Sequence, residues 1–175
     1  MIEYDKIFSW MDKEKPAKEV DIECLKFKTL LPMTQSEIDE TNHSHWDHIK
    51  DSRQEFDSSK WEIPKGTFPN SFVNFLRWSN GGYFENGERN FSPFFSPAEI
   101  RQMLLAYEFP EYMRGAVPFA FDGGGVFYIF DMRKEPADGE YNIYMAGSGA
   151  LFWEDAVFVA ETFNELINGN TAPYE

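Results

Sequence analysis

Hydrophobic positions recur at helical spacing in several parts of the chain. Near the start, the apolar residues lie at i, i+3, i+4 and i+7, which predicts a short amphipathic helix carrying Tyr4, Ile7, Phe8 and Met11. The same spacing predicts helices over 69–79 and 97–107, and a closing helix from Thr162 to Asn168. These helices each offer one apolar stripe to a shared core.

Three tetrapeptides have the form of a capping box, in which a hydroxyl and a carboxylate satisfy the first backbone N–H groups of a helix. They begin at Thr34, Ser96 and Thr162 and predict helix starts at those points. Pro110 is expected to end the helix over 97–107. The mostly polar residues 39–60 predict an exposed helix or an irregular insertion.

Extended apolar runs alternate with turn residues in the second half of the chain. Strands are predicted on both sides of the Asn86-Gly87 dipeptide and on both sides of the glycine-rich turn 122–125. Further strands are predicted over 141–146 and 156–159, and a short one over 24–31 after a loop at 13–23. Consecutive hairpins flanked by helices indicate an α+β fold with a mainly antiparallel sheet.

The composition supports a single folded domain. The chain has 175 residues, 42% of them hydrophobic, and its 18 Phe, 8 Tyr and 5 Trp provide ample material for a core. Local structural signals are weaker in residues 1–60 than in the rest. We therefore expect residues 1–60 to form a helical lead-in packed on a core domain that spans 61–170.

The charge balance bears on partners and location. Sixteen basic against 30 acidic residues give a net charge of −14, which repels nucleic acids and anionic lipid surfaces and favours a basic protein partner. We find neither a membrane-spanning apolar stretch nor a signal-peptide pattern, and Cys24 is the single cysteine. These features predict a cytoplasmic protein, with Cys24 as a small buried hydrophobe at a strand edge.

Known catalytic motifs do not fit the chain. The glycines at 123–125 lack the lysine and hydroxyl residue of a P-loop, and Tyr128 stands where a dinucleotide fingerprint needs its third glycine. The turn Gly147-Ser148-Gly149 is too short for a nucleophile elbow. We therefore expect neither catalysis nor a cofactor.

One cluster has the chemistry of a metal site. His43, His45 and His48 lie within six residues, with Asp47 among them, and imidazole and carboxylate groups are suitable zinc ligands. The three histidines share neither a helix face nor, together, a strand face. They are weak candidates for metal ligands, and the alternative is a solvated polar segment.

Three motifs occur in an order that resembles the SMI1/KNR4 family, also called the SUKH superfamily. The first runs from Ile63-Pro64 through a helix to Asn80-Gly81-Gly82, the second from Val117-Pro118 to Asp122-Gly123-Gly124-Gly125, and the third starts at Trp153-Glu154. The resemblance implies an α+β domain that binds other proteins and has no active site. It also implies structural roles for its motif residues Asn80, Gly81, Gly82, Asp122, Gly123, Gly124 and Gly125.

The resemblance implies two functions. Bacterial relatives are mostly immunity proteins that neutralise polymorphic or contact-dependent toxins, often nucleases, whereas fungal relatives regulate cell-wall glucan synthesis and signalling. We expect an immunity protein that binds a basic toxin domain, with a regulatory scaffold as the alternative and a metal-dependent enzyme at the histidine cluster as a third hypothesis. The residues proposed for partner binding, from their expected loop positions, are Trp46, Tyr83, Phe84 and Glu85.

Overall fold

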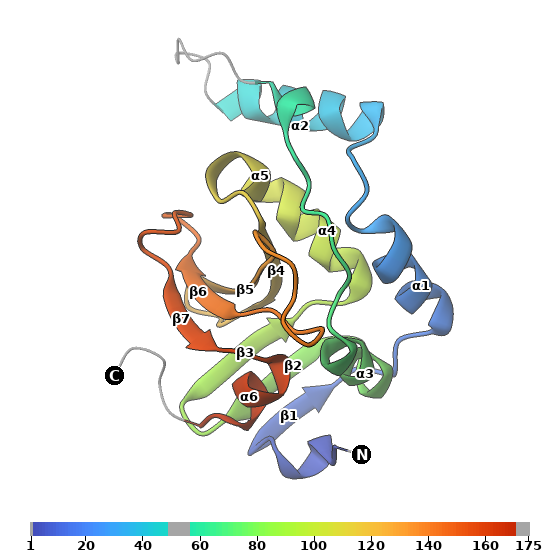
Figure 1. Ribbon diagram of the computed structural model, residues 1–175, viewed down its shortest axis with the longest axis vertical. Helices are drawn as coiled ribbons and strands as arrows, with labels where there is room; N and C mark the ends of the chain where they lie inside the picture. Colours follow the sequence, from blue (N-terminus) through green and yellow to red (C-terminus); the bar gives the residue numbers. More distant parts are fainter. Residues whose placement is uncertain (1, 49–56, 171–175) are drawn as a thin grey trace.

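The computed structural model describes residues 2–48 and 57–170, with the side chains of 44–48 left out. Its centre is a seven-stranded sheet with the order β1-β2-β3-β4-β5-β6-β7, and every neighbouring pair is antiparallel (Figure 1). The strands are β1 Trp10–Lys13, β2 Gly82–Asn86, β3 Arg89–Phe94, β4 Ala116–Phe121, β5 Val126–Asp131, β6 Ile143–Gly147 and β7 Val157–Ala160. The α+β architecture expected from the sequence is confirmed.

Helices flank this sheet. They are α1 Glu19–Lys28, α2 Gln35–His48, α3 Asn70–Trp78, α4 Pro97–Ala106, α5 Phe109–Tyr112 and α6 Phe163–Asn168, with short 3-10 helices η1 Tyr4–Lys6 and η2 Ser58–Lys60. Figure 1 shows α4 and α5 above the sheet, α3 and α6 toward its lower end, and α2 at the upper extremity of the molecule. No helix in the described residues is long and apolar enough to cross a bilayer.

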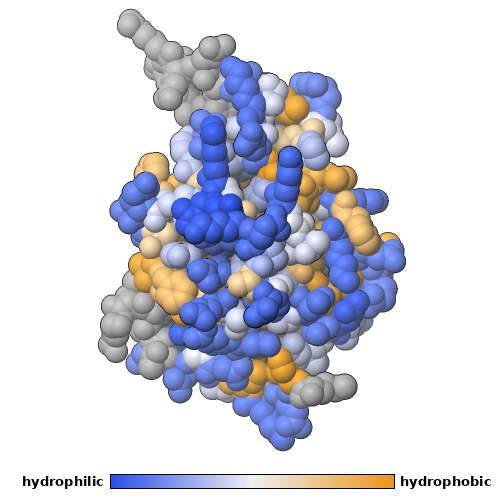
Figure 2. Space-filling model, viewed as in Figure 1, coloured by the Kyte–Doolittle hydropathy of each residue, from blue (hydrophilic) through white to orange (hydrophobic). Residues whose placement is uncertain are grey.

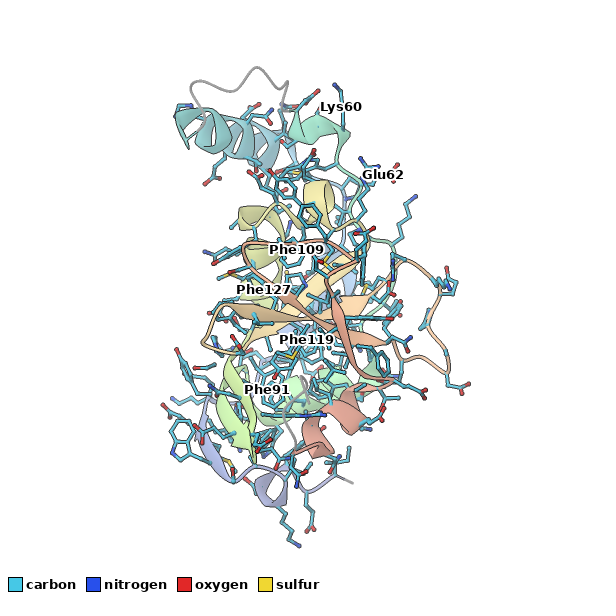
Figure 3. The ribbon with its side chains drawn as sticks, turned by 90° about the vertical axis from the view of Figure 1, so that its left-hand side faces the viewer. Lys60, Glu62, Phe91, Phe109, Phe119 and Phe127 are labelled. Atoms are coloured by element: carbon cyan, nitrogen blue, oxygen red, sulfur yellow. The ribbon has the colours of Figure 1, made fainter. Side chains whose placement is uncertain are left out.

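The core lies on both faces of the sheet because successive strand residues point to opposite sides. In β5, Phe127 packs against Phe109 of α5, with ring centroids 5.3 Å apart. The next residue, Tyr128, instead packs against Phe91, and Phe119 beside it contacts Phe163 of α6. Figure 3 shows the two layers, with Phe109 and Phe127 on one side of the strands and Phe91 and Phe119 on the other.

The N-terminal segment differs from the prediction. The apolar residues Tyr4 and Phe8 are buried as expected, but the backbone forms a 3-10 turn and then strand β1 instead of a helix. Phe8 packs against Phe84, with ring centroids 4.7 Å apart, while β1 pairs with β2. The backbone of β1 therefore forms its hydrogen bonds with the edge strand β2, whereas a helix would have formed them within the segment.

Residues 19–28 form helix α1, so the predicted strand over 24–31 and part of the predicted loop are wrong. Ile22 and Leu25, three residues apart, are buried, whereas Phe27 is 71% exposed. Cys24 lies exposed on this helix and is not a buried residue at a strand edge. The alternation of Leu25 and Phe27 with lysines imitated a strand, but α1 packs on α3 and α4.

The remaining predictions for helices agree better with the structure. The capping boxes at Thr34 and Ser96 open α2 and α4, and the Thr162 hydroxyl accepts from the Glu165 N–H at the start of α6. Pro110 does not end α4, which stops at Ala106, but lies in the first turn of α5. A proline is tolerated there because the first-turn N–H has no helical acceptor.

Candidate functional site

The glycines at 81 and 82 allow separate backbone segments to approach each other closely. Gly81 and Gly82 have φ angles of +85° and +113°, and a Cβ at Gly81 would come within 2.6 Å of the Phe94 carbonyl oxygen. A Cβ at Gly82 would meet the Asp12 carbonyl oxygen at 2.7 Å. Glycine is needed at both positions so that α3 can exit directly into a strand that pairs with β1.

The second motif closes the β4–β5 hairpin. The Oδ1 atom of Asp122 accepts hydrogen bonds from the N–H groups of Gly124 and Val126, at 2.7 and 2.9 Å. Gly123 and Gly125 adopt positive φ angles within this turn. The Asn90 amide of β3 donates to the Asp122 carbonyl oxygen at 2.8 Å, so the hairpin tip is attached to the neighbouring strand.

The register of β1 on β2 gathers an exposed acidic and aromatic surface. Trp10 lies directly opposite Glu85, and Asp12 lies opposite Tyr83. Residues opposite each other in an antiparallel pair share one face, so these four side chains form a single patch, which we call the β1–β2 face. Trp10 is 51% and Tyr83 is 45% exposed, while both carboxylates are also exposed.

The structure places the four residues predicted to bind a partner in different environments. Tyr83 and Glu85 are exposed but lie in strand β2, not in the expected loop. Phe84 is fully buried against Phe8 and Phe75, so it is not available to a partner in this structure. Trp46 lies in α2, and its side chain is outside the described residues.

A hollow of about 270 Å³ adjoins the β1–β2 face. Its lining includes Tyr83, Glu14, Glu99 and Asn80, so acceptor oxygens predominate among its charged and polar groups. The buried Oδ1 atom of Asn80 accepts no hydrogen bond within the part of the chain that the structure describes. The hollow therefore offers two carboxylates, whereas the Asn80 Oδ1 atom is buried from solvent.

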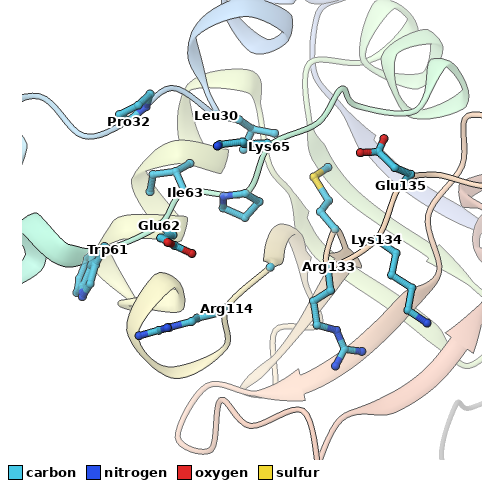
Figure 4. Close-up of a pocket in the computed structure, with 13 residues that line it drawn as sticks. Leu30, Pro32, Trp61, Glu62, Ile63, Lys65, Arg114, Arg133, Lys134 and Glu135 are labelled. Atoms are coloured by element: carbon cyan, nitrogen blue, oxygen red, sulfur yellow. The ribbon is translucent and has the colours of Figure 1, made fainter.

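A larger groove, of about 760 Å³, lies at the other end of the β4–β5 hairpin (Figure 4). One side is formed by the extended segment from Trp61 to Lys65, and the other by Arg114, Arg133 and Lys134. Apolar side chains complete the lining, namely Leu30, Pro32, Ile63, Pro64 and Met132. We call this feature the basic groove.

The histidine cluster lies on α2. His43 is exposed, while the side chains of His45 and His48 fall outside the described residues. Among the described side chains, none of the His, Cys, Asp and Glu residues form a group of three or more that could hold a metal ion. A metal role for His43, His45 and His48 therefore stays a weak hypothesis.

The carboxylate with the most strongly lowered pKa is that of Glu37, which forms an ion pair between two helices. Arg101 donates to both oxygens of Glu37, at 2.6 and 2.8 Å, and this pairing with the Thr34 hydrogen bonds lowers the pKa of Glu37 to about 2. The ion pair joins α2 to α4 and lies in neither the hollow nor the basic groove. It holds α2 against α4, and Glu37 also lines a separate hollow of about 300 Å³ between these helices.

These features define an α+β domain with a seven-stranded antiparallel sheet, an acidic hollow and a separate basic groove. The family model described as SMI1 / KNR4 family (SUKH-1) matches residues 60–169, which is more than half of the chain. The chain belongs to this family, as its motifs indicated. A search of curated proteins finds no match.

Proposed function

We propose that this protein acts by binding another protein, without catalysis, and that the partner is a basic toxin domain which it neutralises. Membership of the SMI1/KNR4 family supports a binding role. The net charge of −14 favours a cationic partner by long-range attraction. A nuclease domain fits this chemistry because it must itself hold an anionic nucleic acid.

The observation that carries the proposal is the β1–β2 face. Tryptophan and tyrosine are the residue types most enriched at the energetic centres of protein interfaces, and here Trp10 and Tyr83 stand exposed beside Asp12 and Glu85. The aromatic pair supplies area for desolvation, whereas the carboxylates select for lysine and arginine. Such a surface suits a basic partner better than an acidic one.

The hollow next to Tyr83 is a second feature of this surface that suits a basic partner. A lysine or arginine side chain entering it would meet the carboxylates of Glu14 and Glu99. Hydrogen bonds from a charged donor are stronger than neutral ones, particularly where water is excluded. We therefore expect a basic side chain of the toxin to insert at this point.

Affinity capture from the source organism tests the proposal. Tagged protein should retain a basic toxin domain in near-equal amount, and mixing the two should suppress the activity of the toxin. The double variant Tyr83→Ala, Glu85→Lys should lose this suppression. A matched variant at the other sheet edge, Phe158→Ala, Glu161→Lys, replaces an equally exposed aromatic residue and should retain it.

Three results would contradict the proposal or a part of it. Retention of a signalling or envelope-synthesis protein in place of a toxin would favour the regulatory scaffold, which is the alternative that the resemblance implies. Zinc bound by the wild-type protein and lost in a variant with His43, His45 and His48 changed to alanine would favour a metal-dependent role instead. Equal suppression by both double variants would remove the β1–β2 face from the interaction.

A further inference from the structure

The basic groove concentrates positive charge on an acidic protein. Four of the 16 basic side chains of the chain line it, together with two carboxylates, Glu62 and Glu135. The lining therefore carries a formal charge of +2, whereas the whole chain carries −14. The four basic residues are Lys65, Arg114, Arg133 and Lys134. Figure 2 shows the most hydrophilic side chains of this view gathered near its middle, where the segments after η2 and after β5 run in Figure 1.

Trp153 contacts both arginines of the groove, through the backbone of Arg114 and the side chain of Arg133. Its indole N–H donates to the Arg114 carbonyl oxygen at 2.9 Å, and its ring lies 3.6 Å from the guanidinium carbon of Arg133. Asp131 accepts two hydrogen bonds from Arg133, at 2.8 and 2.7 Å, and thereby holds its fork in place. The side chain of Arg133 and the backbone of Arg114 are thus positioned before any ligand arrives, which reduces the entropy cost of binding.

The opposite side of the groove is also held in place. The indole N–H of Trp61 donates to a carboxylate oxygen of Glu111 at 2.6 Å, which orients the aromatic ring at one end of the groove. Beyond it, Ile63 and Met132 are buried and close the floor. An apolar floor flanked by cations on both sides suits a chain whose side chains alternate between apolar and acidic, as in an extended peptide.

We propose that the basic groove binds an extended acidic peptide segment of a partner protein, with an apolar side chain anchored on its floor. When Asp131, the ion-pair partner of Arg133, is counted with the lining, the groove keeps a formal charge of +1, which favours an anionic occupant. Its apolar lining and its volume of about 760 Å³ favour a peptide over a small inorganic anion. This binding goes beyond the proposed toxin contact and does not depend on it. The lining of the basic groove shares no residue with the β1–β2 face or with the hollow beside it, so the two proposed contacts use different surfaces.

Selection from a random peptide library displayed on phage tests the proposal with the full chain. Wild-type protein should enrich peptides with Asp or Glu on either side of an aromatic or aliphatic residue. The variant Arg114→Glu, Lys134→Glu should not, because both side chains are exposed and lie in the groove. The control variant Lys15→Glu, Lys18→Glu makes the same change in net charge on exposed residues elsewhere and should enrich the same peptides.

A selected peptide is then measured by fluorescence anisotropy. We expect at least a tenfold weaker affinity for the groove variant and less than a twofold change for the control. Equal weakening in both variants, enrichment of basic peptides only, or no enrichment would overturn the proposal. Displacement of the peptide by inorganic phosphate at an equal concentration would identify a small-anion site, and self-association lost in the groove variant would identify a second copy of the chain as the occupant. Either result would also overturn it.

Discussion

Glu37 of α2 and Arg101 of α4 form a two-pronged ion pair across 64 positions of sequence. The same arginine donates to the carbonyl oxygens of Thr29 and Leu31, at 2.7 and 3.0 Å. One guanidinium thus joins the end of α1, the start of α2 and the exposed side of α4. This contact and the hydrogen bonds from Ser58 of η2 to Asn42 and to the Ile38 carbonyl oxygen hold α2 in place.

The ion pair makes stability depend on pH. The pKa of Glu37 is lowered from 4.5 to about 2, so its contribution is complete above the unfolded pKa and is lost as the pH falls from about 4.5 to about 2. Since the pair is partly screened by water, Glu37→Gln should lower the free energy of unfolding by about 1–2 kcal/mol at pH 7. Urea unfolding should show this difference in the free energy of unfolding between wild type and Glu37→Gln at pH 7, and most of the difference should be lost at pH 2.5. The control Glu40→Gln on the same helix should have little effect at either pH.

Tyr83 and Phe84 are neighbours with opposite expected effects. Phe84→Ala should destabilise the fold by about 3–5 kcal/mol, because it leaves a cavity among the core rings. Tyr83→Ala should change stability by less than about 0.5 kcal/mol and instead weaken binding of the partner. Thermal unfolding combined with titration of the captured toxin separates the two. A stable Phe84→Ala protein would contradict the packing described here.

Gly81→Ala tests the close approach after α3. The new methyl group would meet the Phe94 carbonyl oxygen at 2.6 Å in a left-handed backbone conformation, and we expect a loss of at least about 2 kcal/mol. Gly149→Ala is a matched control, because no atom lies within 4 Å of its added Cβ. If denaturant midpoints for the two variants coincide, the turn does not require glycine at position 81.

Asp122 tests the hairpin tip. Asp122→Ala removes an acceptor from two backbone N–H groups, and we expect a loss of about 1–2 kcal/mol. Both bonds end on the same oxygen, so Asp122→Asn can keep them and should lose less than half as much. Amide hydrogen exchange at Gly124 and Val126 reports on the bonds directly. Unchanged exchange in the alanine variant would show that the tip holds its shape without the carboxylate.

Local signals predicted the second half of the fold well. The box at Ser96 and Glu99 opens α4, because this device acts within four residues. The hairpin between β2 and β3 also forms, but its turn residues are Gly87 and Glu88, since Asn86 pairs with Arg89 and, of these residues, only Gly87 has a positive φ angle. The N-terminal elements could not be predicted in this way. Strand β1 exists because β2 is available to pair with it, and β2 lies some 70 residues further along the chain.

The candidate sites could be predicted from the sequence less completely than the fold could. The sequence drew attention to Tyr83 and Glu85, but Trp10 and Asp12 join them only through the β1–β2 register. The basic groove is assembled from separate segments, and its basic residues show no pattern along the chain. Trp153 was noticed as part of a motif, yet its hold on Arg114 and Arg133 follows only from tertiary contacts.

The pairing of β1 also bears on how this protein is divided in experiments. The family match begins at residue 60, but Tyr4 and Phe8 cover rings of the central core, and β1 protects the edge of β2. A fragment trimmed to the matched region would uncover a row of backbone donors and acceptors next to freshly exposed phenylalanines. Unprotected edges of this kind recruit other strands, so such a fragment would be a seed for aggregation and not a minimal binding unit.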